Sequence, residues 1–304
     1  MKDDKISKIT VPELQARKKS SQKIVALTAY DFPSARVLDE AGLDLILVGD
    51  SLGMVVLGYE NTVPVTMEEM LHHTRAVSRA VRRALVIGDM PYFSFHLSPE
   101  ETVRNASRFL KEAGAGGVKI EGAGRKRLKL IEAMVEAEIP VLGHVGLTPQ
   151  SIHHLGQFKV RGKNLEEARR ILDDALNLEK AGVFAVVLEC VPLELARLVT
   201  GRLSVPTIGI GAGPYCDGQI LVFHDLTGIT PGYLPKFVKK YLDLHSLLGR
   251  AVRSYIEDVR QGDFPGDAHS YHLAEAEKKA MAALGRRSRG GKPAGAGARA
   301  ASAR

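Results

Sequence analysis

Four short apolar runs of this chain each end in an acidic residue. The runs are LILVGD, LVIGD, VKIE and VVLE, and their last residues are Asp50, Asp89, Glu121 and Glu189. A fifth run, VLGH, ends at His144. Runs rich in Val, Ile and Leu are typical of buried strands, and a carboxylate at the end of such a strand costs free energy unless it has a partner. The four acids therefore predict carboxylates gathered around one metal ion and one substrate.

Asp50 and Asp89 end the second and third predicted strands, which are neighbours along the chain. Hard divalent ions such as Mg²⁺ prefer carboxylate oxygens and keep waters and substrate oxygens as their other ligands. Two carboxylates from neighbouring strands suit such a half-open site, and Glu121 is a candidate third ligand, directly or through water. The alternative for each single acid is that it caps the next helix or pairs with a nearby arginine.

Lys119 precedes Glu121 by two residues, so both side chains point to the same side of one strand. An interior lysine is costly unless it meets an anion. A Schiff-base role is conceivable, but the neighbouring carboxylates favour a protonated lysine that binds a substrate anion.

Glu189 follows three apolar residues, and such surroundings would raise its pKa towards the range of a general base. Pairing with a cation elsewhere in the chain is the alternative. His144 is a candidate for orienting or polarising a substrate oxygen, and a purely structural role is its alternative.

The elements that would position these residues alternate along the chain. Strands are expected at eight places: 24–29, 44–49, 84–88, 117–121, 140–144, 183–189, 206–210 and 219–223. Helical segments lie between them, which predicts an α/β fold, a (β/α)₈ TIM barrel. A doubly wound open sheet is the runner-up, but no GxGxxG follows the first strand. Extra helices are expected at 11–19 before the barrel and at 233–246 and 247–261 after it, where they could cap the barrel or serve an oligomer interface.

The positive charge of the chain is concentrated at its end. The net charge is +7, and residues 285–304 contain six Lys or Arg and no acid. Without this tail, 36 basic residues face 35 acidic ones. We therefore expect a catalytic domain over 1–264, an extension over 265–284, and a basic low-complexity tail over 285–304 that is disordered. The near-neutral body argues against a specific nucleic-acid-binding function.

Other features of the sequence concern its compartment. No run approaches the roughly 20 apolar residues that a membrane span needs, and no signal peptide is evident at the N-terminus. Only two cysteines occur, Cys190 and Cys216, so neither a disulfide framework nor a zinc site is expected. These features predict a cytoplasmic protein that does not bind membranes.

Longer motifs resemble those of a known family. They are VGDSLGMVVLGYENTVPVTMEEMLHHTRAVSRA (48–80), GDMPYFSF (88–95), GVKIEG (117–122), VLGHVGLTPQ (141–150), VLEC (187–190) and TIGIGAGPYCDGQILVFHDLTG (207–228). From about residue 5 to about residue 265 the chain resembles the ketopantoate hydroxymethyltransferase family, also called 3-methyl-2-oxobutanoate hydroxymethyltransferase.

The resemblance implies an activity and a set of roles. It implies a Mg²⁺-dependent barrel enzyme, with one Mg²⁺ per subunit, that transfers a hydroxymethyl group from 5,10-methylenetetrahydrofolate to 3-methyl-2-oxobutanoate in pantothenate synthesis. The products would be 2-dehydropantoate and tetrahydrofolate. It also implies a homo-oligomer, commonly a decamer. The implied metal ligands are Asp50, Asp89 and Glu121, the implied substrate contacts are Asp50, Ser51, Asp89 and Lys119, and the implied proton acceptor is Glu189.

Three rival functions compete with the one that the resemblance implies. A 2-oxo acid lyase would use the same barrel and the same Mg²⁺–carboxylate chemistry to cleave a C–C bond. A basic nucleic-acid-binding protein on a barrel scaffold conflicts with the near-neutral body. A catalytically inactive homologue conflicts with the presence of all five ionisable residues: Asp50, Asp89, Lys119, Glu121 and Glu189.

Overall fold

Eight parallel strands form a closed barrel in the order β1 to β8. The computed structural model describes residues 7–232 and 234–287. The strands are β1 (Ile24–Thr28), β2 (Leu45–Val48), β3 (Leu85–Asp89), β4 (Gly117–Glu121), β5 (Val141–Gly146), β6 (Ala185–Glu189), β7 (Thr207–Ile210) and β8 (Gly218–Leu221). The predicted (β/α)₈ barrel is confirmed, and the open sheet is excluded because β1 pairs with β8.

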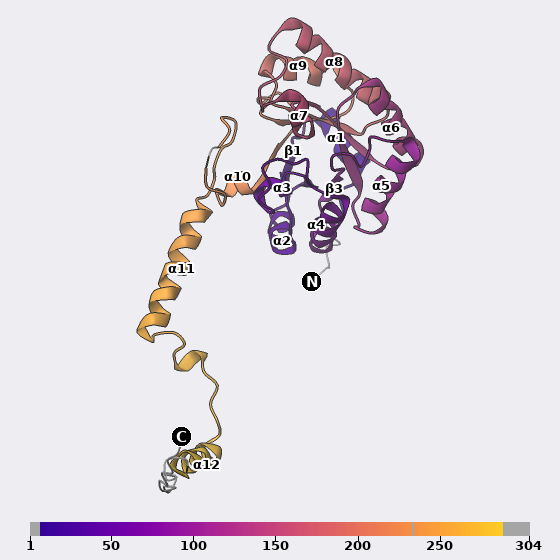
Figure 1. Cartoon of the computed structure of the whole chain (residues 1–304). Helices are drawn as coiled ribbons and strands as arrows, with labels where there is room; N and C mark the ends of the chain where they lie inside the picture. Colours follow the sequence, from indigo (N-terminus) through magenta and orange to yellow (C-terminus); the bar gives the residue numbers. More distant parts are fainter. Residues whose placement is uncertain (1–6, 233, 288–304) are drawn as a thin grey trace, which may run out of the picture. The chain divides into compact units, whose positions relative to one another are not determined.

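Helices surround the strands (Figure 1). They are α2 (Phe32–Glu40), α3 (Leu52–Val55), α4 (Met67–Ala80), α5 (Pro99–Lys111), α6 (Arg125–Glu136), α7 (Ile152–Leu155), α8 (Leu165–Lys180), α9 (Leu193–Arg202) and α10 (Phe223–Thr227), with a short 3₁₀ turn, η1, at Pro149–Ser151. Polar side chains cap the first turns of several of these helices. Thr66 and Glu69 form a complete capping box at α4, whereas Ser98 caps α5 by accepting from the amide of Glu101.

The core has two layers because successive side chains of a strand point to opposite sides. Side chains such as Leu85, Ile87 and Leu142 fill the interior of the barrel. Their neighbours, such as Val86 and Val141, pack between the strands and the surrounding helices. Asp89 and His144 continue the inward-facing alternation, which points both side chains into the barrel at its carboxyl end, called the mouth below.

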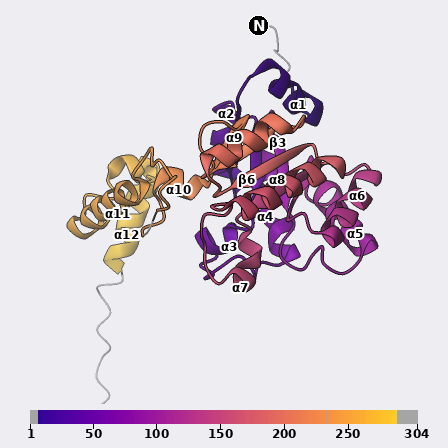
Figure 2. The same ribbon diagram turned by 90° about the horizontal axis from the view of Figure 1, so that it is seen from above.

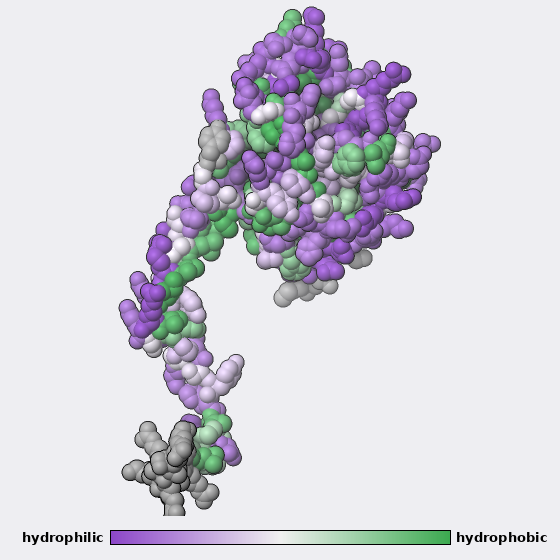
Figure 3. All heavy atoms as spheres, in the orientation of Figure 1, coloured by the Kyte–Doolittle hydropathy of each residue, from purple (hydrophilic) through white to green (hydrophobic). Residues whose placement is uncertain are grey.

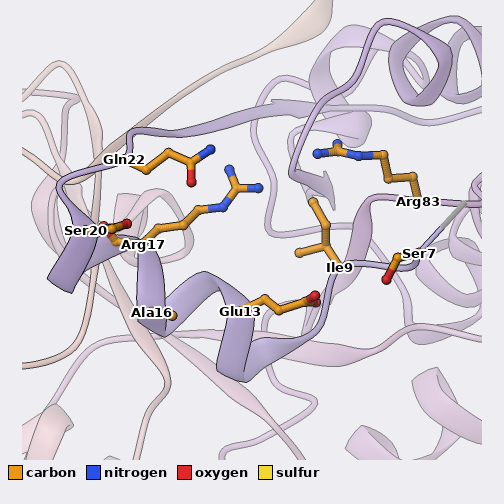
Figure 4. A pocket seen from close by; sticks show the side chains of 8 residues that line it. All are labelled: Ser7, Ile9, Glu13, Ala16, Arg17, Ser20, Gln22 and Arg83. Carbon is orange, nitrogen blue, oxygen red and sulfur yellow. The ribbon is translucent and has the colours of Figure 1, made fainter.

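The helix α1 (Val11–Ser20) lies at the end of the barrel opposite the mouth, where Leu14 packs into the interior layer. In Figure 2, α1 lies at one end of the barrel and α3 and α7 lie at the other. Arg17 of α1 forms an ion pair with Asp44 at the start of β2, and a guanidinium nitrogen of Arg83 lies 3.4 Å from the same carboxylate. A cavity of about 440 Å³ opens beside these arginines (Figure 4), far from the strand-end acids.

The predicted helix over 233–246 is wrong. Residues 234–243 contain no helix, and a single helix, α11 (Leu244–Gln261), replaces the two that were expected after the barrel. Pro235 restricts Leu234 to extended conformations. The amide of Tyr241 then donates to the carbonyl of Leu226, which holds this stretch along α10 instead of in a helix of its own.

The described residues divide into two compact units, one that ends at His245 and one that begins at Ser246. The second contains most of α11, a 3₁₀ turn η2 (Asp267–His269) and α12 (Glu275–Arg287). One face of α11 carries large exposed apolar side chains (Figure 3), and these include Leu248, Val252, Tyr255, Ile256 and Val259. Residues 285–287 end α12, and the rest of the predicted tail, 288–304, lies outside the described residues. None of the helices within 7–232 and 234–287 is long and apolar enough to cross a membrane.

A tight contact supports the strand that ends in Asp89. A Cβ atom on Gly88 would lie 2.3 Å from Cδ1 of Phe109, which is fully buried in α5. We expect Gly88→Ala to lower the free energy of unfolding by about 1–3 kcal/mol, the usual cost of overpacking, as measured by urea denaturation. In the control, Gly201→Ala in α9, the added Cβ meets no atom within 4 Å. Equal stability of the two variants would contradict this packing.

Candidate active site

The predicted site residues lie around the mouth. Asp89, Glu121 and Glu189 are the last residues of β3, β4 and β6, and Asp50 comes two residues after β2. His144 differs from the prediction because β5 continues for two residues beyond it. Strand pairing sets Asp89 beside Lys119 and Glu121 beside His144, so groups distant in sequence become neighbours in the barrel.

Lys119 lies at the centre of the cluster. Its ammonium nitrogen is 2.8 Å from both carboxylate oxygens of Asp89 and 3.5 Å from Oε1 of Glu121. All three residues are buried. The amide of Asp50 donates to Oδ2 of Asp89 at 3.2 Å, which brings the ends of β2 and β3 together. Contact with two carboxylates favours the protonated form of Lys119.

His144 lies between two acids. Its Nδ1 is 3.6 Å from Oε1 of Glu121, and its Nε2 is 3.3 Å from Oε2 of Glu189. Neither ring nitrogen makes an aligned hydrogen bond with another described residue. The Glu189 side chain is 18% exposed whereas that of Asp89 is 2% exposed, so Glu189 is the acid of this group that reaches the open mouth.

Sequence reasoning missed Gln150. Its side-chain amide donates to Oδ2 of Asp50 and to the carbonyl of Met90, both at 2.9 Å, and its backbone amide donates to Oε2 of Glu121 at 3.1 Å. Gln150 thereby joins the loop after β5 to the acids that follow β2 and β4. Its place in a loop at the carboxyl end of a barrel strand was the one available signal.

Ser51 directly follows Asp50 and begins α3. Its hydroxyl lies 2.8 Å from the hydroxyl of Tyr30, which is buried and follows β1. Burial raises the pKa of Tyr30 above its usual value. Tyr30 therefore stays neutral and holds Ser51 at the edge of the carboxylate cluster.

Burial dominates the electrostatics of the site. It raises the pKa of Asp89 and that of Glu121 to about 7, and that of Glu189 to about 8. Burial lowers the pKa of His144 to about 4, and the charge of Lys119 adds to this effect, so the ring is neutral near pH 7. Burial alone would lower the pKa of Lys119. The nearby acids Asp89, Glu121 and Asp50 outweigh this effect and raise the pKa above its usual value.

The site holds more carboxyl groups than cations. Asp50, Asp89, Glu121 and Glu189 face one fixed ammonium group, and His144 is neutral. Within the described part of the chain, no three His, Cys, Asp or Glu side chains form a ready-made metal cluster. Mg²⁺, however, binds to proteins through one or two carboxylates and takes its remaining ligands from water and substrate. A set of carboxyl oxygens gathered at the ends of neighbouring strands fits such an ion.

Comparison with known proteins identifies the family. A sequence profile described as Ketopantoate hydroxymethyltransferase matches residues 8–267. The chain belongs to this family. Its members are enzymes of the transferase class, as the sequence predicted. A protein from Thermoanaerobacter sp. (strain X514) named 3-methyl-2-oxobutanoate hydroxymethyltransferase is 56% identical over 91% of this chain and 100% of its own length. A protein of the same name from Syntrophomonas wolfei is 53% identical over 89% of this chain and 98% of its own length.

Solved structures share the barrel of this hydroxymethyltransferase family member at low sequence identity. A phosphonopyruvate hydrolase superposes with a TM-score of 0.58 at 14% identity and covers 92% of this chain and 97% of its own. A 2,3-dimethylmalate lyase gives a TM-score of 0.55 at 17% identity, with coverage of 92% and 96%. These likenesses concern the fold alone.

Proposed function

We propose that this chain transfers a hydroxymethyl group to 3-methyl-2-oxobutanoate in pantothenate synthesis, the route to coenzyme A. The donor is 5,10-methylenetetrahydrofolate, water supplies the hydroxyl group, and the products are 2-dehydropantoate and tetrahydrofolate. Relatives with 53–56% identity carry the name of this activity. The observation that carries the proposal is the placement of Lys119 between Asp89 and Glu121, with Glu189 at the open mouth beyond His144.

A divalent ion, Mg²⁺ in this proposal, belongs to the active enzyme. Asp50 and Asp89 would hold it, with Glu121 as a direct or water-mediated third partner. When bound, the ion would withdraw electron density from the keto and carboxylate oxygens of the substrate and make its C3–H more acidic.

The residues of the chain carry the remaining roles. Lys119 neutralises negative charge on the substrate carboxylate or on the enolate oxygen, and the hydroxyl of Ser51 contacts the same carboxylate. Glu189 removes the proton from C3, and the electron pair of that C–H bond forms the new bond to the one-carbon unit. His144, neutral and 3.3 Å from Glu189, orients the base.

The second candidate function is that of a 2-oxo acid lyase, which would cleave a C–C bond without folate. The lyase among the solved structures shares 17% of its sequence with this chain, and this level supports the fold and not the reaction. The relatives that are 53–56% identical to this chain support hydroxymethyl transfer instead.

An assay of the purified chain distinguishes these functions. We expect 2-dehydropantoate, detected by NMR, when 3-methyl-2-oxobutanoate, 5,10-methylenetetrahydrofolate and Mg²⁺ are all present. Omission of the folate or addition of EDTA should stop its formation. Folate-independent cleavage of a 2-oxo acid, or no product with all components present, would overturn the proposal.

The pH dependence of proton removal tests the role of Glu189. Burial raises its pKa to about 8, and a base acts only when it is ionised. We therefore expect the rate of C3–H exchange for deuterium, measured by NMR, to rise with pH up to about 8 and then to level off. The part of the rise that belongs to Glu189 should be missing in Glu189→Gln. A rate that is constant or that falls between pH 6 and pH 8 would be inconsistent with this base.

Assembly and location complete the proposal. We infer a homodecamer in the cytoplasm that binds its two small-molecule substrates and acts without nucleic acid or membrane. The exposed apolar face of α11 supports an oligomer, because large apolar patches on a surface mark interaction sites. Size-exclusion chromatography with light scattering measures the subunit number.

A further inference from the structure

A second cavity adjoins the carboxylate cluster. It has a volume of about 270 Å³, and its wall includes Glu121 and Gln150, which both belong to the site described above. The rest of its wall comes from the segments that follow three consecutive strands, β3, β4 and β5. Tyr92 and His96 follow β3, Arg127 lies in the first turn of α6 after β4, and His153 lies in α7 after β5.

One wall of this cavity is aromatic and neutral. The ring centroid of His96 lies 5.1 Å from that of Tyr92, 5.7 Å from that of Phe93 and 4.6 Å from that of Phe95. A guanidinium nitrogen of Arg127 lies 3.2 Å from Nε2 of His96, which makes this nitrogen the acceptor and places the ring proton on Nδ1. Burial, together with the charge of Arg127, lowers the pKa of His96 to about 4. Tyr92 remains 39% exposed, so the flat face of its ring is available to a ligand in the cavity.

The same cavity holds a cation, Arg127, that forms no close ion pair with a described residue. The guanidinium of Arg127 lies 4.1 Å from the centre of the Phe95 ring and donates to the carbonyl of Phe95. No carboxylate among residues 7–232 and 234–287 lies within ion-pair distance of Arg127. Burial lowers the pKa of Arg127 to about 10, and the charge of Glu121 in the same wall acts against this change. Because Glu121 lies beyond ion-pair distance, the half-buried guanidinium remains able to pair with an anionic ligand.

The position of the cavity narrows the choice of ligand. Asp89 and Lys119 are 1% and 4% exposed. In the proposed function the small 2-oxo acid occupies the space above them, so a second substrate would approach from the side. The cavity provides this approach, and Glu121 and Gln150 border both spaces. We propose that this cavity binds the reduced-folate donor, with the pterin ring stacked on Tyr92 and His96 and with Arg127 attracting the carboxylates of the glutamate tail. This inference rests on the proposed function.

Direct binding of a stable folate separates this site from the chemistry. The probe is 5-formyltetrahydrofolate, measured by isothermal titration calorimetry with wild type, Tyr92→Ala and Arg127→Met. We expect each substitution to weaken binding about tenfold through lost stacking or lost charge, and to raise the KM for 5,10-methylenetetrahydrofolate by a similar factor. Folate-independent C3–H exchange and the KM for the 2-oxo acid should change much less. The control is Tyr215→Ala, an exposed tyrosine beneath Arg197 in the loop between β7 and β8, across the barrel.

Each outcome decides one question. If wild type binds the folate and transfers the hydroxymethyl group, but Tyr92→Ala and Arg127→Met bind it as tightly as Tyr215→Ala, the cavity is not the donor site and the proposed function stands. An equal loss in folate binding, exchange and the KM for the 2-oxo acid would indicate a structural role and would also overturn the inference. If wild type neither binds folate nor transfers the group, the proposed function itself fails, and the inference fails with it.

Discussion

Glu189→Gln is expected to lower the rate of hydroxymethyl transfer about 10²–10⁴-fold, the usual contribution of a positioned acid–base group. Glutamine keeps the size of the side chain and its place at the end of β6, but it cannot accept the C3 proton. The loss should appear in kcat for transfer and equally in the rate of folate-independent C3–H exchange, because both need proton removal. Steady-state kinetics and NMR measure these two quantities.

A matched substitution five residues away controls for the loss of a carboxylate. Glu194 is exposed in the first turn of α9, and Glu194→Gln should leave both rates unchanged. A near-normal exchange rate in Glu189→Gln would remove Glu189 from the role of base. A loss confined to transfer, with exchange intact, would place Glu189 in a later step than proton removal.

The second large effect is expected for Asp89→Asn. This change removes one partner of the buried pair with Lys119, which costs about 3–5 kcal/mol of stability when the remaining charge stays buried. It also removes a proposed metal ligand. In wild type, Mg²⁺ at 100 times its Kd should add about 2.7 kcal/mol to the free energy of unfolding, and this gain should disappear in the variant together with Mg²⁺-dependent exchange.

Thermal unfolding with Mg²⁺ and with EDTA measures this gain. The control is Asp173→Asn, because Asp173 is an exposed acid on α8, away from the mouth. Its Tm should rise with Mg²⁺ as that of wild type does. An unchanged Mg²⁺-dependent rise in Asp89→Asn would show that the ion binds without Asp89.

The barrel and most of its site could be predicted from local sequence. Short apolar runs determine the eight strands, and helices separate all of them except β7 and β8, which a loop joins. The acids at the ends of β3, β4 and β6 were placed correctly. The two-residue spacing of Lys119 and Glu121 predicted that their side chains share one side, and the 3.5 Å distance between them confirms it. These features depend on strand periodicity, which a single sequence contains.

Other features depend on contacts between distant parts of the chain. Gln150 bonds to Asp50, which lies 100 residues away, and no local pattern marks such a pair. The grouping of His96 with Arg127 depends in the same way on how the loops after β3 and β4 fold over the mouth. The predicted helix over 233–246 is absent over 234–243, where Pro235 and a backbone hydrogen bond to α10 prevent it.

The central claim is that the acids at the mouth hold one divalent ion together with the 2-oxo acid. A crystal structure with Mn²⁺ and 3-methyl-2-oxobutanoate tests it most directly, because the anomalous signal of manganese locates the ion. The predicted result is one ion bound by carboxylate oxygens of Asp50 and Asp89, with the substrate carboxylate beside Lys119 and C3 facing Glu189. An ion bound elsewhere, or a 2-oxo acid seated without one, would contradict the claim.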